Sequence, residues 1–309
     1  MAEIIFPKPI EKGAKIAVVS PAGTVTEQQL EKGLKLIESK GYEAVLGPNL
    51  YGKHINGYPY SGTEKERISD MNWALNEEEL SAIWTSRGGY GCQHLLSDLK
   101  LTKFKKEPKW FIGYSDNTVI QSYLLKNNFA SIHAQTIKTS GFGVSDESYD
   151  LTFDILKGKF PNYNIDSNKF NKPGKAKSQL VGGNLALVYA LLGTPYSFNF
   201  KDKILFIEEI GEKFYALDRM LMSLELAGVF REISGLIIGG MTLMDDEKEN
   251  KNYEESFDEF SCELIAERIS KYDFPALFGF PNGHIFDNRP LIIGADIEMN
   301  VGKKCTVKF

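Results

Sequence analysis

The chain has 309 residues, of which 42% are hydrophobic and 25% are charged, and its formal net charge is -5 at pH 7. This length predicts about two domains, each long enough to bury a core. The acidic balance and the scattered basic residues argue against a nucleic-acid or anionic membrane surface as the main partner.

Three cysteines, Cys92, Cys262 and Cys305, lie far apart in the chain. Their odd number and spacing predict neither a disulfide framework nor a zinc site, so a reducing cytoplasm is the expected compartment. The N-terminal residues lack an apolar segment behind a basic start, and no run of about 18 apolar residues occurs. We therefore expect no signal peptide and no membrane span.

Strand and helix patterns alternate through the first half. Apolar strands are expected at 15–20, 42–47, 80–86, 109–115 and 129–135. Helices are expected after capping boxes at Thr24–Glu27 and Thr63–Glu66, over 88–99, and from Asp116 onward. Repeated βα units with short connections predict a parallel sheet covered by helices.

The periodic pattern weakens between 146 and 178, where Lys, Asn, Pro and Gly accumulate. This stretch predicts a linker at 161–178 between an N-terminal domain, 1–160, and a C-terminal domain, 179–309. In the second domain, strands are expected at 203–212, 233–241 and 275–278, with helices from Asn184, over 215–228 and over 256–271. The acidic stretch 244–256 is expected to be a solvated loop.

A serine follows directly after the apolar strand in "KWFIGYSDNT", between Gly113 and a helix start. Ser115 in such a turn would present its hydroxyl near backbone N–H groups, which suit a developing oxyanion. The alternative is that Ser115 and Asp116 only cap the helix, which is the commoner role of these residue types.

A nucleophilic serine needs a base to take its proton. Of the four histidines, His284 stands in the Pro/Gly loop "GFPNGH" just past an apolar strand, where a side chain can enter a cleft. His54, His94 and His133 have less favourable contexts. Glu208 closes the apolar strand "ILFIEE" and is a candidate orienting carboxylate, whereas Glu209 should point to the other side.

The motif "WTSRGGYG", 84–91, places successive glycines after a strand. Their backbone N–H groups can face a ligand, although paired glycines also permit close packing. A dinucleotide fingerprint is incomplete, because His94 stands where the third glycine is required. Arg87 stands directly before this turn.

These motifs occur together in one order: "IAVVSPAG", "TSRGGYGCQHLL", "FIGYSDNT", "GGNLALV", "ILFIEEIGE", "LDRMLMSLELAG", "SGLIIGG" and "PNGH". In this combination the sequence resembles the LD-carboxypeptidase family of serine peptidases from about Lys15 onward. The resemblance implies an N-terminal parallel α/β domain and a smaller C-terminal α/β domain, with the active site at their interface. It also implies a cytoplasmic homodimer that needs no metal or organic cofactor.

The resemblance assigns roles to individual residues. The nucleophile falls on Ser115, the acid on Glu208 and the general base on His284. Main-chain N–H groups of Gly88, Gly89 and Asp116 become the oxyanion hole. An exopeptidase must also bind the terminal carboxylate of its substrate, for which Arg87, Arg219 and Arg289 are candidates, and Tyr90 is a further candidate substrate-binding residue.

Family members release the terminal D-alanine of murein tetrapeptides during cell-wall recycling, and a sister branch cleaves the peptide-nucleotide microcin C. No long insert with a nucleotide-stacking tryptophan follows the linker, which favours the murein peptide as substrate. The segment "IHAQT" departs from the family's usual His-Gly-Pro, so no role follows for His133. Two rival interpretations are a two-domain binding protein without catalysis and, with less support, a Rossmann-type oxidoreductase.

Overall fold

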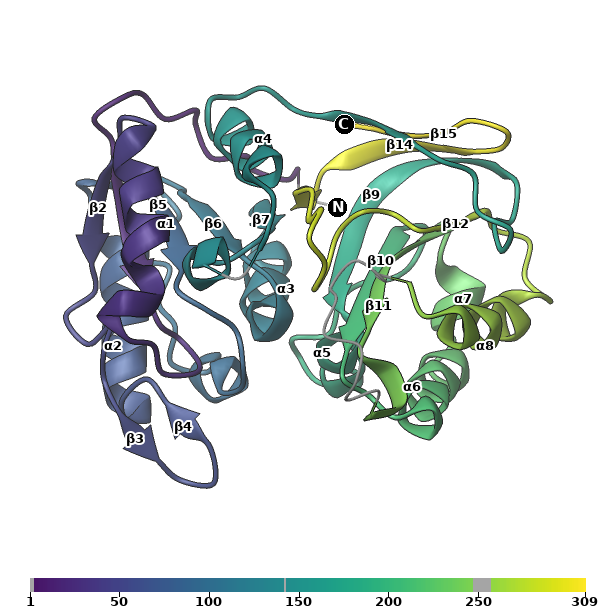
Figure 1. The fold of residues 1–309 in the computed structure, drawn as a ribbon, viewed down its shortest axis with the longest axis horizontal. Coiled ribbons are helices and arrows are strands. Elements are labelled where there is room, and N and C mark those ends of the chain that lie inside the picture. The colour runs from purple at the N-terminus through teal and green to yellow at the C-terminus, as the bar shows by residue number, and fades with distance from the viewer. Residues whose placement is uncertain (1–2, 142, 247–256) are drawn as a thin grey trace. The chain divides into compact units, whose positions relative to one another are not determined.

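The computed structural model describes residues 3–141, 143–246 and 257–309. These residues form two units, one made of the described residues up to 159 together with 289–292, and one made of those from 160 to 288 together with 293–309 (Figure 1). Each unit combines a sheet with helices, so the α/β class expected from the sequence is confirmed. No helix in the described part is long and apolar enough to cross a membrane.

The first unit is built on a six-stranded sheet with the order β13-β7-β6-β5-β1-β2. Its strands are β1 (Lys15–Val19), β2 (Glu43–Leu46), β5 (Leu80–Thr85), β6 (Trp110–Gly113), β7 (Ser131–His133) and β13 (Leu291–Ile293). The pairs from β2 through β7 are parallel, as the βα alternation predicts. Every residue of β6 is buried, which is typical of a parallel strand covered on both faces.

The helices of this unit are α1 (Glu27–Ser39), α2 (Glu64–Asn76), α3 (Thr118–Lys126) and α4 (Asp146–Leu156). The capping box at Thr63 and Glu66 is confirmed. The first capping box was assigned to the wrong pair, because Thr26 and Gln29 form it and Thr24 instead donates to the carbonyl of Gly52. The pattern Thr-x-x-Glu/Gln occurs twice within three residues, and only the tertiary contact distinguishes the two.

The helix expected over 88–99 is reduced to one 3₁₀ turn, Cys92–Leu95. Gly89 and Gly91 before it have φ values of 110° and 132°. These left-handed conformations belong to a glycine turn and are incompatible with a right-handed helix.

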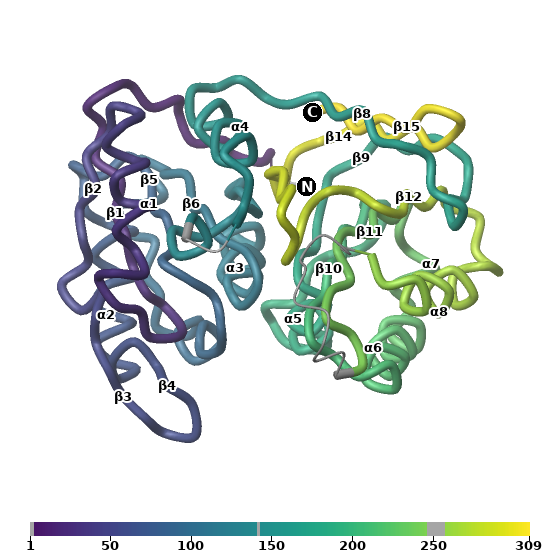
Figure 2. The backbone as a smooth tube through the Cα atoms, viewed as in Figure 1, coloured from purple at the N-terminus to yellow at the C-terminus, as the bar shows by residue number. Residues whose placement is uncertain are grey.

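The second unit contains a seven-stranded sheet with the order β12-β11-β10-β9-β14-β15-β8. Its strands are β8 (Asn162–Ile165), β9 (Gly174–Asn184), β10 (Ile204–Ile210), β11 (Gly235–Thr242), β12 (Ala276–Phe278), β14 (Asp296–Val301) and β15 (Cys305–Lys308). The strands β9 to β12 pair in parallel, whereas β14 is antiparallel to β9 and to β15. Figure 2 follows the chain through this mixed sheet to the C-terminus.

The α-helices in the described part of this unit are α5 (Leu185–Ala190), α6 (Phe214–Leu226), α7 (Val229–Glu232) and α8 (Glu259–Ile269). The helices expected after Asn184 and over 215–228 are therefore present. Of the acidic stretch 244–256, Met244–Asp246 form a 3₁₀ turn, and residues 247–256 lie outside the described residues.

The segment 146–178 is more ordered than its composition suggests. It contains α4, β8 and the first part of β9, so residues 161–178 belong to the second unit and contribute β8 and the start of β9 to its sheet. In α4, Tyr149, Phe153 and Leu156 recur at helical spacing and are buried. In β9, lysines alternate with less exposed residues, a polar pattern typical of one solvated sheet face that hid the strand in the sequence.

Candidate active site

Ser115 lies at the sharp turn between β6 and α3. The strand ends at Gly113, and a 3₁₀ turn, Ser115–Asn117, leads into the helix. Ser115 has a φ of 61°, a left-handed conformation that costs a non-glycine residue about 1–3 kcal/mol and recurs at functional sites. The serine is only partly buried, although its neighbours Tyr114 and Asp116 are buried. The strand-to-helix turn expected from the sequence is present, with its serine accessible.

The glycine turn of 88–91 lies against this serine. A Cβ at Gly88 would be 2.8 Å from the Cβ of Ser115, 2.9 Å from its Oγ and 3.4 Å from the backbone N of Asp116. The structure thus brings together Gly88, Ser115 and Asp116, three residues that the sequence grouped as nucleophile and oxyanion hole. A glycine at 88 is required, because any side chain would collide with the serine.

Gly89 faces an aromatic residue that the sequence analysis missed. A Cβ at Gly89 would lie 2.0 Å from the hydroxyl of Tyr58, which precedes the short strand β4 (Pro59–Tyr60) of a hairpin with β3 (His54–Ile55). The rings of Tyr58 and Tyr90 meet edge to face at 5.9 Å. The hairpin tyrosines Tyr58 and Tyr60 therefore lie against the glycine turn. In the sequence, only the motif "GYPY" pointed to them.

Arg87 is anchored to the backbone next to this turn. Its Nη1 donates to the carbonyl of Thr24 at 3.0 Å, and the side chain is half-buried. Tyr90 is 42% exposed. Both side chains are therefore close to the glycine turn and partly accessible. Arg219 stacks instead over the ring of Tyr215 on α6, at 5.5 Å.

In the second unit, Glu208 and His284 form a hydrogen-bonded pair. The Oε2 of Glu208 is 2.8 Å from Nδ1 of His284, and the side chains are 0% and 14% exposed. Glu208 comes from the end of β10, and His284 from the loop that follows β12. A carboxylate at Nδ1 fixes the ring tautomer and leaves Nε2 as the basic nitrogen.

The loop that carries His284 passes close to the carboxylate of Glu208. Gly283 has a φ of 123°, and a Cβ there would lie 2.9 Å from the Oε2 of Glu208. The N–H of Gly283 donates to Asn288, and the hydroxyl of Thr242 donates to the carbonyl of His284. The loop sequence "NGH" therefore needs its glycine both for backbone conformation and for space.

Glu209 is also buried, although the sequence pattern indicated no role for it. Its carboxylate accepts hydrogen bonds from Asn184 Nδ2 at 2.9 Å and from the N–H of Ala186 at 2.7 Å, at the start of α5. Burial, together with the charge on Glu208, raises its pKa to about 7. Two adjacent buried glutamates thus precede the last residue of β10, one bound to His284 and the other to the start of α5.

The remaining histidines have other partners. His133 is buried on β7, and its Nδ1 is 3.0 Å from Oε1 of Gln121, whose amide donates to the carbonyl of Gly113. His133 is therefore linked through Gln121 to Gly113, two residues before Ser115. The Nε2 of His94 lies 3.3 Å from the hydroxyl of Tyr90, and His54 lies exposed in β3. Within the described residues, no group of three His, Cys, Asp or Glu side chains is arranged to hold a metal.

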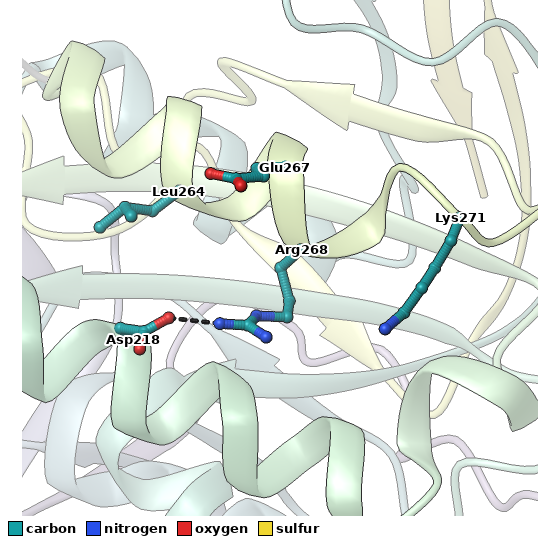
Figure 3. A pocket seen from close by; sticks show the side chains of 5 residues that line it. All are labelled: Asp218, Leu264, Glu267, Arg268 and Lys271. Carbon is teal, nitrogen blue, oxygen red and sulfur yellow. Dashed lines mark hydrogen bonds and ion pairs between the residues drawn. The ribbon is translucent and has the colours of Figure 1, made fainter.

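A pocket of about 180 Å³ in the second unit contains none of the predicted site residues. It is lined by Asp218 on α6, by Leu264, Glu267 and Arg268 on α8, and by Lys271 (Figure 3). Arg268 is bound by Asp218 at 2.6 Å and by Glu225 at 3.1 Å. Because its guanidinium is already neutralised by protein carboxylates, the pocket is explained as part of an ion-pair network between two helices.

Comparison with known proteins decides the family. The model of the LD-carboxypeptidase N-terminal domain matches residues 16–134, and that of the LD-carboxypeptidase C-terminal domain matches residues 177–299. The chain belongs to the LD-carboxypeptidase family. The resemblance noted in the sequence is thereby confirmed, over both units.

Similar proteins and a similar crystal structure support this membership in the LD-carboxypeptidase family. The probable murein peptide carboxypeptidase of Bacillus subtilis is 31% identical, over 97% of this chain and 93% of the relative. The microcin C7 self-immunity protein of Escherichia coli is 24% identical, over 92% and 89% of the two chains. The crystal structure of muramoyltetrapeptide carboxypeptidase from Oxalobacter formigenes matches with a TM-score of 0.80 at 24% identity, over 95% of this chain and 98% of that one. At this identity, the structural match establishes the shared LD-carboxypeptidase fold alone.

Proposed function

We propose that this protein is a serine carboxypeptidase that hydrolyses an L,D-amide bond and releases the terminal D-alanine of murein tetrapeptides. The observation that carries the proposal is the buried Glu208 carboxylate bound to Nδ1 of His284. A carboxylate in this position makes an imidazole an effective general base. The strained, partly accessible Ser115 supplies the matching nucleophile.

In the first half of the reaction, Nε2 of His284 takes the hydroxyl proton of Ser115 as Oγ attacks the carbonyl carbon before D-alanine. Glu208 stabilises the imidazolium that forms. The oxyanion is received by backbone N–H groups of Gly88 or Gly89 and of Asp116. In comparable sites, each such donor contributes about 3–4 kcal/mol to the stability of the transition state.

Collapse of the tetrahedral intermediate breaks the amide bond. His284 gives its proton to the departing amine of D-alanine, and the remaining peptide is held as an ester on Ser115. A water molecule, deprotonated by His284, then attacks the ester, and the proton returns to Ser115. Apart from this water molecule, the steps use only the three side chains and the backbone donors.

An exopeptidase must also recognise the terminal carboxylate of its substrate. We assign this role to Arg87, which is held beside the glycine turn through its bond to Thr24 and retains further guanidinium donors. Tyr90, with its exposed ring in the same place, is assigned to a contact with the peptide. With Arg87 and Tyr90 in these roles, the C-terminal end of the peptide substrate would bind next to the glycine turn.

The murein peptide is favoured over a peptide-nucleotide for two reasons. The Bacillus subtilis relative, named for murein peptide, is 31% identical, whereas the microcin immunity protein is 24% identical. In addition, no tryptophan occurs after Trp110 in this sequence, so the second unit has no indole to stack on a nucleobase.

The test is incubation with murein tetrapeptides that carry lysine or diaminopimelate at the third position, with D-alanine release followed by mass spectrometry. A peptidyl-adenylate is tested in parallel. We expect release from at least one tetrapeptide and none after Ser115→Ala. A fluorophosphonate probe should label the wild-type protein at Ser115. Absence of both release and labelling would favour the binding-protein interpretation, and cleavage of the adenylate alone would reassign the substrate.

A further inference from the structure

The side chain of Asp116 joins the nucleophile turn to the glycine turn. The residue is 1% exposed, and its Oδ2 accepts a hydrogen bond from the backbone N–H of Cys92 at 2.8 Å. Cys92 is the first residue after the glycine turn of 88–91. A single carboxylate thus connects the residue after the proposed nucleophile with the far end of that turn.

Neighbouring side chains hold the glycine turn at its other points. Asn117 donates to the carbonyl of Tyr114 at 3.0 Å and to that of Arg87 at 3.5 Å, just before the turn. The Nη1 of Arg67 donates to the carbonyl of Gly91 at 2.9 Å. The glycines themselves have no side chains to fix them, so these polar contacts set where the turn lies relative to Ser115.

Burial of the Asp116 carboxylate has a free-energy cost, because a charged group loses its hydration. Burial raises the pKa of Asp116, and its Oδ1 has no hydrogen-bond partner among the described residues. An apolar side chain would avoid the cost of desolvating a charge. A group retained in spite of such a cost commonly serves a functional site.

We propose that the Asp116 carboxylate is a positioning group that fixes the glycine turn, so that its backbone N–H groups and that of Asp116 converge on one oxyanion. This inference rests on the proposed serine-peptidase function and deepens it. Oxyanion donors act only when they are correctly placed, and a displacement of about 1 Å costs about 100-fold in rate.

The decisive variant is Asp116→Leu, which keeps the size of the side chain and removes the acceptor for Cys92. We expect kcat for D-alanine release to fall about 100-fold, with KM changed less than about threefold, because the contact acts on the transition state. Asp116→Asn keeps an acceptor oxygen and should restore kcat to within about tenfold of wild type. If the leucine variant fails to fold, Asp116→Ala replaces it.

Asp70 offers a matched control within the same unit. It is 4% exposed, and its carboxylate accepts from the backbone N–H of Asn49 at 2.9 Å and from its side chain at 2.7 Å. Asp70→Leu therefore removes a buried carboxylate whose backbone contact is to Asn49 and not to the glycine turn. We expect a comparable loss of thermal stability with kcat unchanged.

The rate at which a fluorophosphonate labels Ser115 separates this inference from the proposed function, because labelling needs the oxyanion hole and no murein peptide. Slower labelling of Asp116→Leu, with normal labelling of Asp70→Leu, supports the positioning role. Equal labelling of both variants and wild type rejects that role and leaves the peptidase proposal standing. If wild-type protein is neither labelled nor active, both are rejected.

Discussion

Nδ1 of His284 lies 2.8 Å from a carboxylate oxygen of Glu208, and that carboxylate is completely buried. The two residues are 76 positions apart in the chain. The end of β10 and the loop after β12 bring them together, and Gly283 provides the space. Among the described residues of the second unit, this hydrogen-bonded pair is the feature on which the proposed function rests.

Replacement of Glu208 by glutamine should leave the fold intact and nearly abolish turnover. An amide in place of the carboxylate favours the wrong imidazole tautomer and no longer stabilises the imidazolium. In comparable triads this change lowers kcat by about 10⁴-fold. Steady-state D-alanine release measures the effect, with Glu298→Gln as the control, because Glu298 is exposed on β14 and pairs only with Lys177 among its described contacts. A Glu208→Gln enzyme of normal kcat would contradict the role assigned to the pair.

Gly88→Ala should disable catalysis by steric pressure on the nucleophile. The added methyl would lie 2.8 Å from the Cβ of Ser115, so the serine or the turn must move. We expect kcat to fall at least about 100-fold, since a shift of about 1 Å has that effect. Gly302→Ala is the matched control, because the nearest atom to its Cβ is 4.0 Å away. Comparable activity of the two variants would show that the close approach of Gly88 to Ser115 has no catalytic consequence.

Glu209 should make the protein less stable as the pH rises toward neutrality. Its pKa is raised from 4.5 to about 7, so between these values the native state binds more protons than the unfolded state. The free energy of unfolding therefore falls across this window, by at most about 3 kcal/mol from this residue, and the loss is complete above pH 7.

Denaturant unfolding at pH values from 4.5 to 8 measures this dependence. Glu209→Gln cannot titrate, so its stability should decline less steeply than that of wild type over the same window. A residual slope is expected from Asp70 and Asp116, whose pKa values burial also raises. Identical slopes for the variant and wild type would mean that Glu209 does not titrate there.

Arg268→Ala should destabilise the second unit without affecting turnover. The guanidinium binds Asp218 and Glu225 between α6 and α8, and Glu225 is only 11% exposed in its side chain. Loss of a mostly buried partner costs more than loss of a surface ion pair, and about 1–3 kcal/mol is expected here. Lys35→Ala, which breaks the exposed pair with Glu31, should cost less than about 1 kcal/mol. Denaturation midpoints compare the two, and equal losses would contradict the special role of the α6–α8 network.

The sequence by itself determined the elements whose signals are local. The all-apolar strands, the capping box at Thr63 and the turn that carries Ser115 depend on neighbouring residues, and all three are present in the structure. The order of motifs also identified the family, because "FIGYSDNT" and "PNGH" preserve short backbone conformations that only certain residues permit.

Only the tertiary structure decided which distant groups meet. The approach of Gly88 to Ser115 and the bond from Cys92 to Asp116 arise just past the ends of β5 and β6 in the first unit's sheet, and the burial of Glu209 arises near the end of β10 in the second unit's sheet. Likewise, β13 joins the first unit's sheet beside β7, although it is only three residues long and far from the other strands in the chain. Such pairings depend on the summed packing of a whole sheet, so no local pattern of side chains can specify them.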